Sequence, residues 1–243
     1  MDDLLLWQYI AIGLIFVWTG FVRSGLGFGG AALGLPLLLL VVDNPLIWLP
    51  LIGIHLLFFS SITVGSRFGN VDWKFLKHAL LVMIVPTLIG VFGLLTLPTA
   101  WMVNFIYGIT LFYAFCYMFK YQIHSESRWF DTVLLVMGGY VSGASLIGAP
   151  LIVAVSVHRV MASKLRDTLF VLWFILVSIK LPVLAYAGVD FWWWHHLWLL
   201  PCAALGHIVG LKLHGRLISG DAERFKQVIG AALLVICFTG MFF

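Results

Sequence analysis

The sequence predicts an all-α polytopic membrane protein with two inverted structural repeats. Hydrophobic residues make up 63% of the 243 residues and charged residues only 10%. One soluble core of this size cannot hide so much apolar surface, so the surrounding medium must be lipid. Long apolar segments and a glycine-rich passage that occurs twice complete the case for this fold.

A helix needs about 17 to 25 apolar residues to cross the ~30 Å hydrocarbon layer of a bilayer. The chain offers about eight segments of that length together with shorter pieces, so we expect about eight full transmembrane helices. The apolar segments lie at 4–22, 28–42, 46–64, 75–97, 101–119, 129–141, 147–157, 169–187, 193–211 and 225–243.

The duplicated passage interrupts an apolar stretch in each half of the chain. Residues 20–31 are glycine-rich, and residues 138–149 repeat the pattern 118 positions later. A duplication with a break in each half is typical of transporters whose substrate site lies near the midplane between symmetry-related repeats. We expect a first transmembrane repeat over 1–119, a cytoplasmic linker over 120–128 and a second repeat over 129–243.

Two segments beside the second break are too short to span. At 1.5 Å per residue, neither 129–141 nor 147–157 crosses the hydrocarbon layer. They are expected to form a re-entrant or half-helix hairpin. Non-helical backbone persists at membrane depth only where protein or a wet cavity satisfies its polar groups, so the glycine-rich turns should face the interior.

The basic residues predict the orientation. Lysines and arginines concentrate in loops on the cytoplasmic side of membrane proteins. Here 12 of the 14 fall in four linkers, and the intervening loops contain none, so both termini are expected outside. Segments 46–64 and 169–187 then run in opposite directions, which makes the repeats inverted. The 12 residues are Arg67, Lys74, Lys77, Lys120, Arg128, Arg159, Lys164, Arg166, Lys212, Arg216, Arg224 and Lys226.

The two breaks predict an anion site. Half-helices that begin near Gly30 and Gly148 would each direct N-terminal amides, with a partial positive charge, towards the middle of the protein. Serine hydroxyls and two cations can add donors, whereas an alternative reading is that the glycines only permit tight helix packing and the serines bond to backbone. The predicted substrate-binding residues are Arg23, Ser24, Gly25, Gly27, Gly29, Gly30, Ser142, Gly143, Ser145, Gly148, Pro150 and Lys180.

Lys180 lies about two turns inside the predicted outer end of its segment. A charge near the bilayer centre costs about 2.5 to 3.5 kcal/mol or more, so such a residue is functional or paired by default. The alternative is that its long side chain reaches the outer interface. Pro182 lies nearby and would kink the helix and leave a carbonyl unpaired.

Other chemistry is weakly supported. His55 and His207 are the membrane-embedded titratable candidates for a proton relay, which would make the proton the coupling ion, and the alternative for each is a hydrogen-bonded helix contact. No catalytic or metal-ligand motif occurs, so we expect no enzyme activity, cofactor or metal. The basic residues are scattered among short loops, which argues against a nucleic-acid partner, and a homo-oligomer is left open.

Several short motifs resemble the TauE/SafE sulfite exporter family, also called the toluene sulfonate uptake permease family. The resemblance spans nearly the whole chain, but its motifs are short and glycine-dominated. It departs from the family pattern at the second break, where Ser145 and Ile147 replace two glycines. The motifs are Gly25-Leu-Gly-Phe-Gly-Gly30, Pro36-Leu-Leu, Arg67-Phe-Gly-Asn-Val-Asp72-Trp73, Gly139-Tyr-Val-Ser-Gly143, Gly148-Ala-Pro150, Arg166-Asp-Thr168, Lys180, Gly206-His-Ile-Val-Gly210 and Leu213-His-Gly-Arg216.

The resemblance implies a permease of the bacterial inner membrane for sulfite, organosulfonates or related small sulfur-containing anions, most often an exporter. Combined with the inverted repeats, it predicts a secondary transporter that works by alternating access. Two alternatives remain: a passive anion channel, which the same architecture can support, and a non-transporting accessory protein of the membrane.

Overall fold

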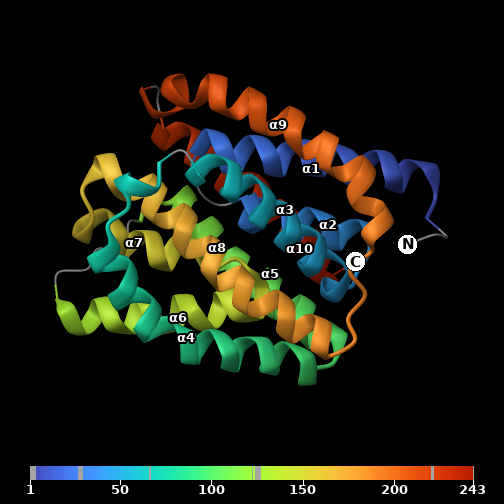
Figure 1. Cartoon of the computed structure of the whole chain (residues 1–243). Coiled ribbons are helices and arrows are strands. Elements are labelled where there is room, and N and C mark those ends of the chain that lie inside the picture. The colour runs from blue at the N-terminus through green and yellow to red at the C-terminus, as the bar shows by residue number, and fades with distance from the viewer. Residues whose placement is uncertain are drawn as a thin grey trace. The chain divides into compact units, whose positions relative to one another are not determined.

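The structure is a computed structural model that describes residues 4–26, 30–65, 67–121, 123, 127–219 and 222–242. Over these residues the chain is all-helical, as predicted, with ten α-helices and one short 3₁₀ helix (Figure 1). They are α1 (Leu6–Leu26), α2 (Gly30–Val41), α3 (Pro45–Gly65), η1 (Phe68–Asn70), α4 (Trp73–Thr96), α5 (Thr99–Met118), α6 (Arg128–Ser145), α7 (Ala149–Arg159), α8 (Ala162–Tyr186), α9 (Trp193–Ser219) and α10 (Ala222–Phe242).

Six of the helices in the described residues are long and apolar enough to cross a membrane, against the eight or so expected from the sequence: α1, α3, α4, α5, α8 and α9. Helices α2 and α7 have only 12 and 11 residues. At 1.5 Å per residue each is about 17 to 18 Å long, which is little more than half of the hydrocarbon layer. The described apolar part of α10, Gln227–Phe242, is also shorter than a full span.

Each predicted apolar segment corresponds to one helix, but α6, α8 and α9 extend well beyond the predicted segments. Helix α6 has 18 residues, whereas the sequence predicted 129–141. Ser127 caps its first turn by accepting a hydrogen bond from the backbone N–H of Phe130, which lets the helix begin earlier. Gly143 and Ser145 remain helical and extend it beyond the predicted end.

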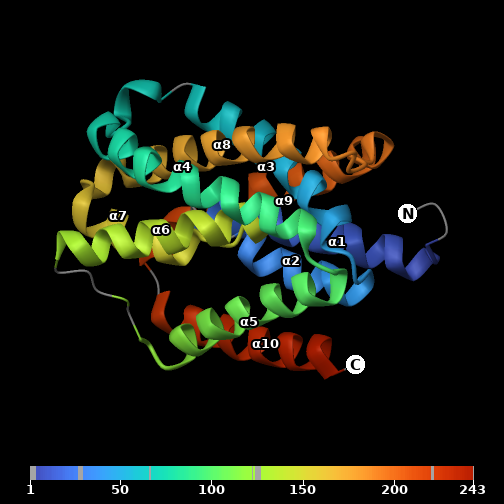
Figure 2. The same ribbon diagram turned by 90° about the horizontal axis from the view of Figure 1, so that it is seen from below.

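The chain forms two compact units, and each takes helices from both halves of the sequence. Unit 1 comprises the described residues of 1–48, 98–121 and 192–243. In it α1 lies along α9, and α5 lies along α10, a pair that is visible in Figure 2. The short helix α2 packs against α1, α5 and α10. A cluster of buried apolar side chains joins these helices: Val22, Leu33, Ala114, Ile229 and Leu233.

Unit 2 comprises the described residues of 49–97 and 122–191. Here α4 lies along α6, and α7 contacts both α6 and α8. Helix α8 also contacts α4 and the short helix η1. All the helices of the second break therefore belong to one unit.

Glycines bring α1 and α9 into backbone contact. A Cβ atom added at Gly206 would lie 1.8 Å from the carbonyl oxygen of Val17, and one at Gly20 would lie 2.2 Å from that of Ala203. No real side chain tolerates such distances. Small residues let helix backbones approach closely in a membrane, where dispersion contacts replace the hydrophobic drive of water.

Glycines also bring α4 and α6 into backbone contact in unit 2. A Cβ atom at Gly143 would lie 2.0 Å from the carbonyl oxygen of Thr87, and one at Gly90 would lie 2.2 Å from that of Tyr140. The Thr87 hydroxyl also donates a hydrogen bond to the Gly139 carbonyl at 3.1 Å. Both contacts therefore depend on residues without a side chain.

The packing of α1 on α9 predicts that Gly206→Ala destabilises the protein. The added methyl group forces the two backbones apart, and overpacking of this kind costs about 1 to 3 kcal/mol. We expect a melting temperature lower by several degrees in detergent. Gly108→Ala in α5 is the control, because nothing lies within 4 Å of a Cβ atom there. An equal melting temperature for Gly206→Ala and the control would contradict this account of the contact.

Candidate functional site

The second break lies between α6 and α7. Leu146 ends α6 in the left-handed conformation, with φ of 62°, and its N–H donates to the Ser142 carbonyl at 3.0 Å. Helix α7 then begins with Gly148 as its N-cap and Pro150 in its first turn, and no side chain caps it. The first amides of an uncapped helix carry a partial positive charge and can receive an anion.

Gly148 brings this helix end close to α6. A Cβ atom at Gly148 would lie 2.2 Å from the Ser142 Oγ and 2.2 Å from the Gly138 carbonyl oxygen. Any other residue would therefore push the start of α7 away from the Ser142 hydroxyl. The glycine acts here through close approach, since its φ and ψ of −69° and −4° are open to all residues.

The two serines of this break differ in their contacts. The Ser145 hydroxyl donates to the Val141 carbonyl at 2.8 Å within α6, as the packing alternative expects of a serine in a membrane helix. Ser142 is 6% exposed, and its hydroxyl has no hydrogen-bond partner. The Ser142 hydroxyl is therefore the one available to a ligand.

Lys180 is buried inside unit 2, with only 1% of its surface exposed. Its ammonium donates a hydrogen bond to the Gly143 carbonyl oxygen at 2.6 Å. That carbonyl belongs to the last turn of α6, where carbonyls lack helical partners and the helix end carries a partial negative charge. The contact uses one of the three N–H donors of the ammonium.

The first break belongs to unit 1. Arg23 and Ser24 are buried in the last turn of α1, and the Ser24 hydroxyl hydrogen-bonds to Nδ1 of His207 in α9. Helix α2 begins at Gly30, where a Cβ atom would lie 2.9 Å from the Thr19 carbonyl oxygen. Gly25 is buried inside α1. The predicted site residues Gly27 and Gly29 lie outside the described residues.

The two candidate relay histidines lie in different units. Nδ1 of His55 is 2.6 Å from the Leu51 carbonyl oxygen in its own helix, so this nitrogen carries a hydrogen. His207 bonds to Ser24. Both histidines therefore make the helix contacts that the alternative describes, and a role in proton relay stays a prediction.

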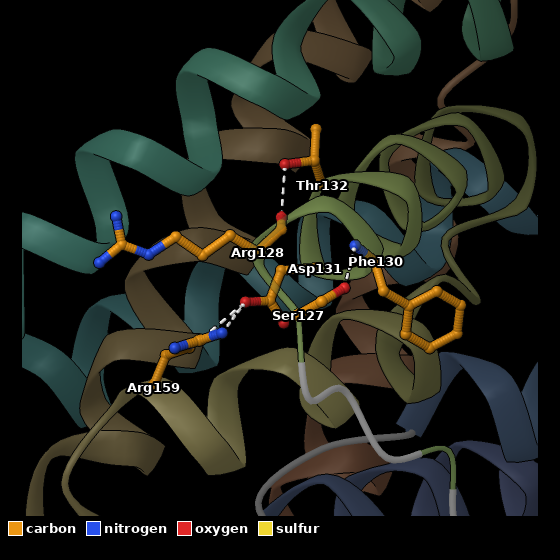
Figure 3. A network of polar contacts seen from close by, with 6 residues as sticks. All are labelled: Ser127, Arg128, Phe130, Asp131, Thr132 and Arg159. Carbon is orange, nitrogen blue, oxygen red and sulfur yellow. Dashed lines mark hydrogen bonds and ion pairs between the residues drawn. The ribbon is translucent and has the colours of Figure 1, made fainter.

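An ion pair that was not predicted from the sequence holds α6 and α7 together. Asp131 is 6% exposed, and its Oδ2 accepts a hydrogen bond from Arg159 Nε at 2.7 Å and forms an ion pair with Arg159 Nη2 at 2.5 Å (Figure 3). Asp131 lies in the first turn of α6 and Arg159 in the last turn of α7. The start of a helix favours a negative charge and its end favours a positive charge. These preferences were the signal in the sequence from which the pair could have been predicted.

A second missed cluster ties η1 to the start of α8. The Asn70 side-chain amide donates to Asp167 Oδ2 at 2.6 Å and to the Ser163 carbonyl at 2.8 Å. The backbone N–H of Asp72 donates to the Thr168 hydroxyl at 2.9 Å. All of these residues except Ser163 belong to two of the motifs that carry the family resemblance, and those motifs were the available signal. We call this set of contacts the loop latch.

The family model for the sulfite exporter TauE/SafE matches residues 12–239. The chain belongs to the TauE/SafE family. Comparisons with curated proteins and with solved structures gave no match. As a TauE/SafE protein with six candidate spans in its described residues, the chain is a multi-pass membrane transporter and not an enzyme. Within those residues, no three His, Cys, Asp or Glu side chains come together as metal ligands.

In this TauE/SafE protein the Asp131 and Arg159 pair is expected to stabilise the α6–α7 hairpin. A double-mutant cycle with Asp131→Asn and Arg159→Gln should give a coupling energy of about 1 to 2 kcal/mol, reduced because the Arg159 side chain is 38% exposed. Thermal unfolding in detergent measures it.

Arg128→Gln is the matched control, because Arg128 lies on the same turn of α6 and its side chain points away from Asp131 (Figure 3). A cycle of Asp131→Asn with Arg128→Gln should give no coupling. Equal coupling in both cycles would show that the effect is one of general charge and not of this contact.

Proposed function

We propose that this TauE/SafE protein is a secondary transporter of a small sulfur-containing oxyanion such as sulfite or an organosulfonate, and that it acts as an exporter in the inner membrane with both termini outside. Family membership supports the class of substrate. The observation that carries the proposal for this chain is the buried ammonium of Lys180, which bonds to the last turn of α6 beside the uncapped start of α7.

The donors near this break suit an oxyanion. The Lys180 ammonium uses one N–H on Gly143 and has two more to offer. The Ser142 hydroxyl has no partner, and the first amides of α7 are capped by no side chain. Sulfite and sulfonate groups carry three oxygen acceptors on one sulfur atom. These acceptors match the ammonium, hydroxyl and backbone amide donors at this break. We assign Gly148 and Pro150 to the same site, since they form the start of α7.

Electrostatics favours an anion over a neutral ligand here. Removing an ammonium from water costs several kcal/mol, and one carbonyl dipole offsets only part of it. A bound anion neutralises the charge in a medium where electrostatic attraction is strong. Lys180 is therefore better stabilised with substrate than without it.

The duplicated sequence supports alternating access. Gly30 and Gly148, 118 positions apart, each begin a short helix that packs on the helix before it. We assign Arg23, Ser24, Gly25 and Gly30 to the first copy of the break, and Gly27 and Gly29 are assigned with them from the sequence alone. Rocking of one repeat against the other, with a proton carried by His55 and His207, completes the proposed mechanism.

Counterflow in proteoliposomes tests the proposal. Wild-type protein should exchange labelled sulfite or a short organosulfonate with saturable kinetics, and Lys180→Met should reduce the exchange at least about tenfold because the charge is lost. Lys180→Arg keeps the charge and should retain part of the activity. Lys164→Met, at the start of the same helix, is the control for loss of a cation.

Two results would contradict the proposal. Wild-type exchange in folded Lys180→Met protein would remove Lys180 from the site. A large, unsaturated flux of many anions through the wild type would instead favour a passive channel.

The serine pair gives a finer test. Ser142→Ala should raise the sulfite concentration for half-maximal exchange at least about tenfold, because a hydroxyl that donates to a charged ligand contributes about 1.5 to 3 kcal/mol. Ser145→Ala is its matched control, since that hydroxyl is already bonded to Val141. An equal effect of the two substitutions would refute the assignment of Ser142 to the substrate.

A further inference from the structure

Two arginines flank the loop latch, away from Lys180. Arg67 directly precedes η1, and Arg166 lies near the start of α8. The hydrogen bonds of Asn70 to Ser163 and Asp167 hold these two segments together. Asn70 lies three positions after Arg67 and Asp167 directly follows Arg166, so the bond between them brings the two arginines close together in the fold. The fold therefore places two cations beside this set of contacts, with the Asp167 carboxylate next to Arg166 as a partly compensating charge.

The Arg166 guanidinium lacks the partners that such a group needs. Its Nε and Nη2 atoms are buried and have no hydrogen-bond partner. The guanidinium carbon lies 5.6 Å from the centre of the Phe170 ring. The ring can stabilise a cation, but it cannot accept two parallel hydrogen bonds from the guanidinium group as an oxyanion does. The neighbouring Asp167 carboxylate is engaged by Asn70. Adjacent N–H groups on one edge of a guanidinium match two oxygens of one anion.

We propose that Arg166 and Arg67 form a second oxyanion site, distinct from the one assigned to Lys180. Its ligand is an oxyanion of tetrahedral or pyramidal shape, either a free sulfur or phosphorus oxyanion or the phosphate of an anionic lipid headgroup. Arg67 is exposed and Arg166 half-buried, so the ligand approaches from the side of Arg67. The loop latch holds together the two segments that carry these arginines. The proposal is independent of the transport mechanism proposed above.

The test uses the full chain in nanodiscs of neutral phosphatidylcholine, with sulfate as the probe and tryptophan fluorescence to follow unfolding. All variants carry Lys180→Met, which silences the proposed substrate site. Sulfate should raise the melting temperature in a saturable way, and chloride at equal ionic strength should not. Arg166→Gln should weaken the apparent affinity for sulfate at least about tenfold.

Controls separate the site from general charge. Lys164→Gln removes a cation two positions away on α8 and should leave the affinity within about twofold. Arg166→Lys keeps the charge but cannot donate two parallel hydrogen bonds, so this variant should bind sulfate with intermediate affinity. It also tests the proposal if Arg166→Gln does not fold. Arg67→Gln should weaken binding as well. Equal sulfate affinity for Arg166→Gln and Lys164→Gln would overturn the proposal.

A second set of measurements, in nanodiscs that contain phosphatidylglycerol, distinguishes a lipid headgroup from a free oxyanion as the ligand. If nanodiscs with phosphatidylglycerol stabilise the protein in a manner that requires Arg166, and sulfate then adds nothing, the ligand is a headgroup phosphate. If phosphatidylglycerol leaves the sulfate response unchanged, the ligand is a free oxyanion. Absence of saturable stabilisation by sulfate, phosphate and phosphatidylglycerol alike would overturn the proposal.

Discussion

The contacts of Gly143 are the constraint on which unit 2 depends. Its Cα faces the Thr87 carbonyl so closely that α4 and α6 touch through backbone atoms. Its carbonyl accepts the hydrogen bond of Lys180, so the same residue connects α6 to α8. Lipid offers no hydrogen bonds to an unpaired carbonyl or a buried ammonium, so each group must find its partner inside the protein. One glycine therefore fixes the position of the cation and of the helix end beside it.

The charges at the ends of α6 and α7 follow from the same principle. The positive start of α6 carries Asp131, the negative end of α7 carries Arg159, and the negative end of α6 receives Lys180. Each of these ends is matched by a charge of the favourable sign. The start of α7 has no side-chain cap, and the Ser142 hydroxyl next to it has no partner. An anion bound at the start of α7 would give this helix end a charge of the favourable sign as well.

The sequence predicted the helices well because length and hydropathy decide which segments enter a membrane. It mispredicted α6 because a glycine-rich stretch reads as a break, whereas Gly143 remains helical and its lack of a side chain is used for contact with α4. The contacts of Asp131 and Asn70 were missed because their partners lie 28 and 97 positions away, so a favourable helix end or a family motif indicates the residue but not its partner. Lys180 was found because a buried charge in an apolar segment is conspicuous in any fold.

Helix α8 links the chemistry of the two proposed sites. Arg166 and Lys180 are 14 positions apart, which is about 21 Å along the helix and close to four full turns, so they lie near the same face. The loop latch holds the helix at one end through Asp167 and Thr168, and Gly143 holds it near the other through Lys180. Both sets of contacts act on one continuous helix, so they set the positions of Arg166 and Lys180 along the same axis.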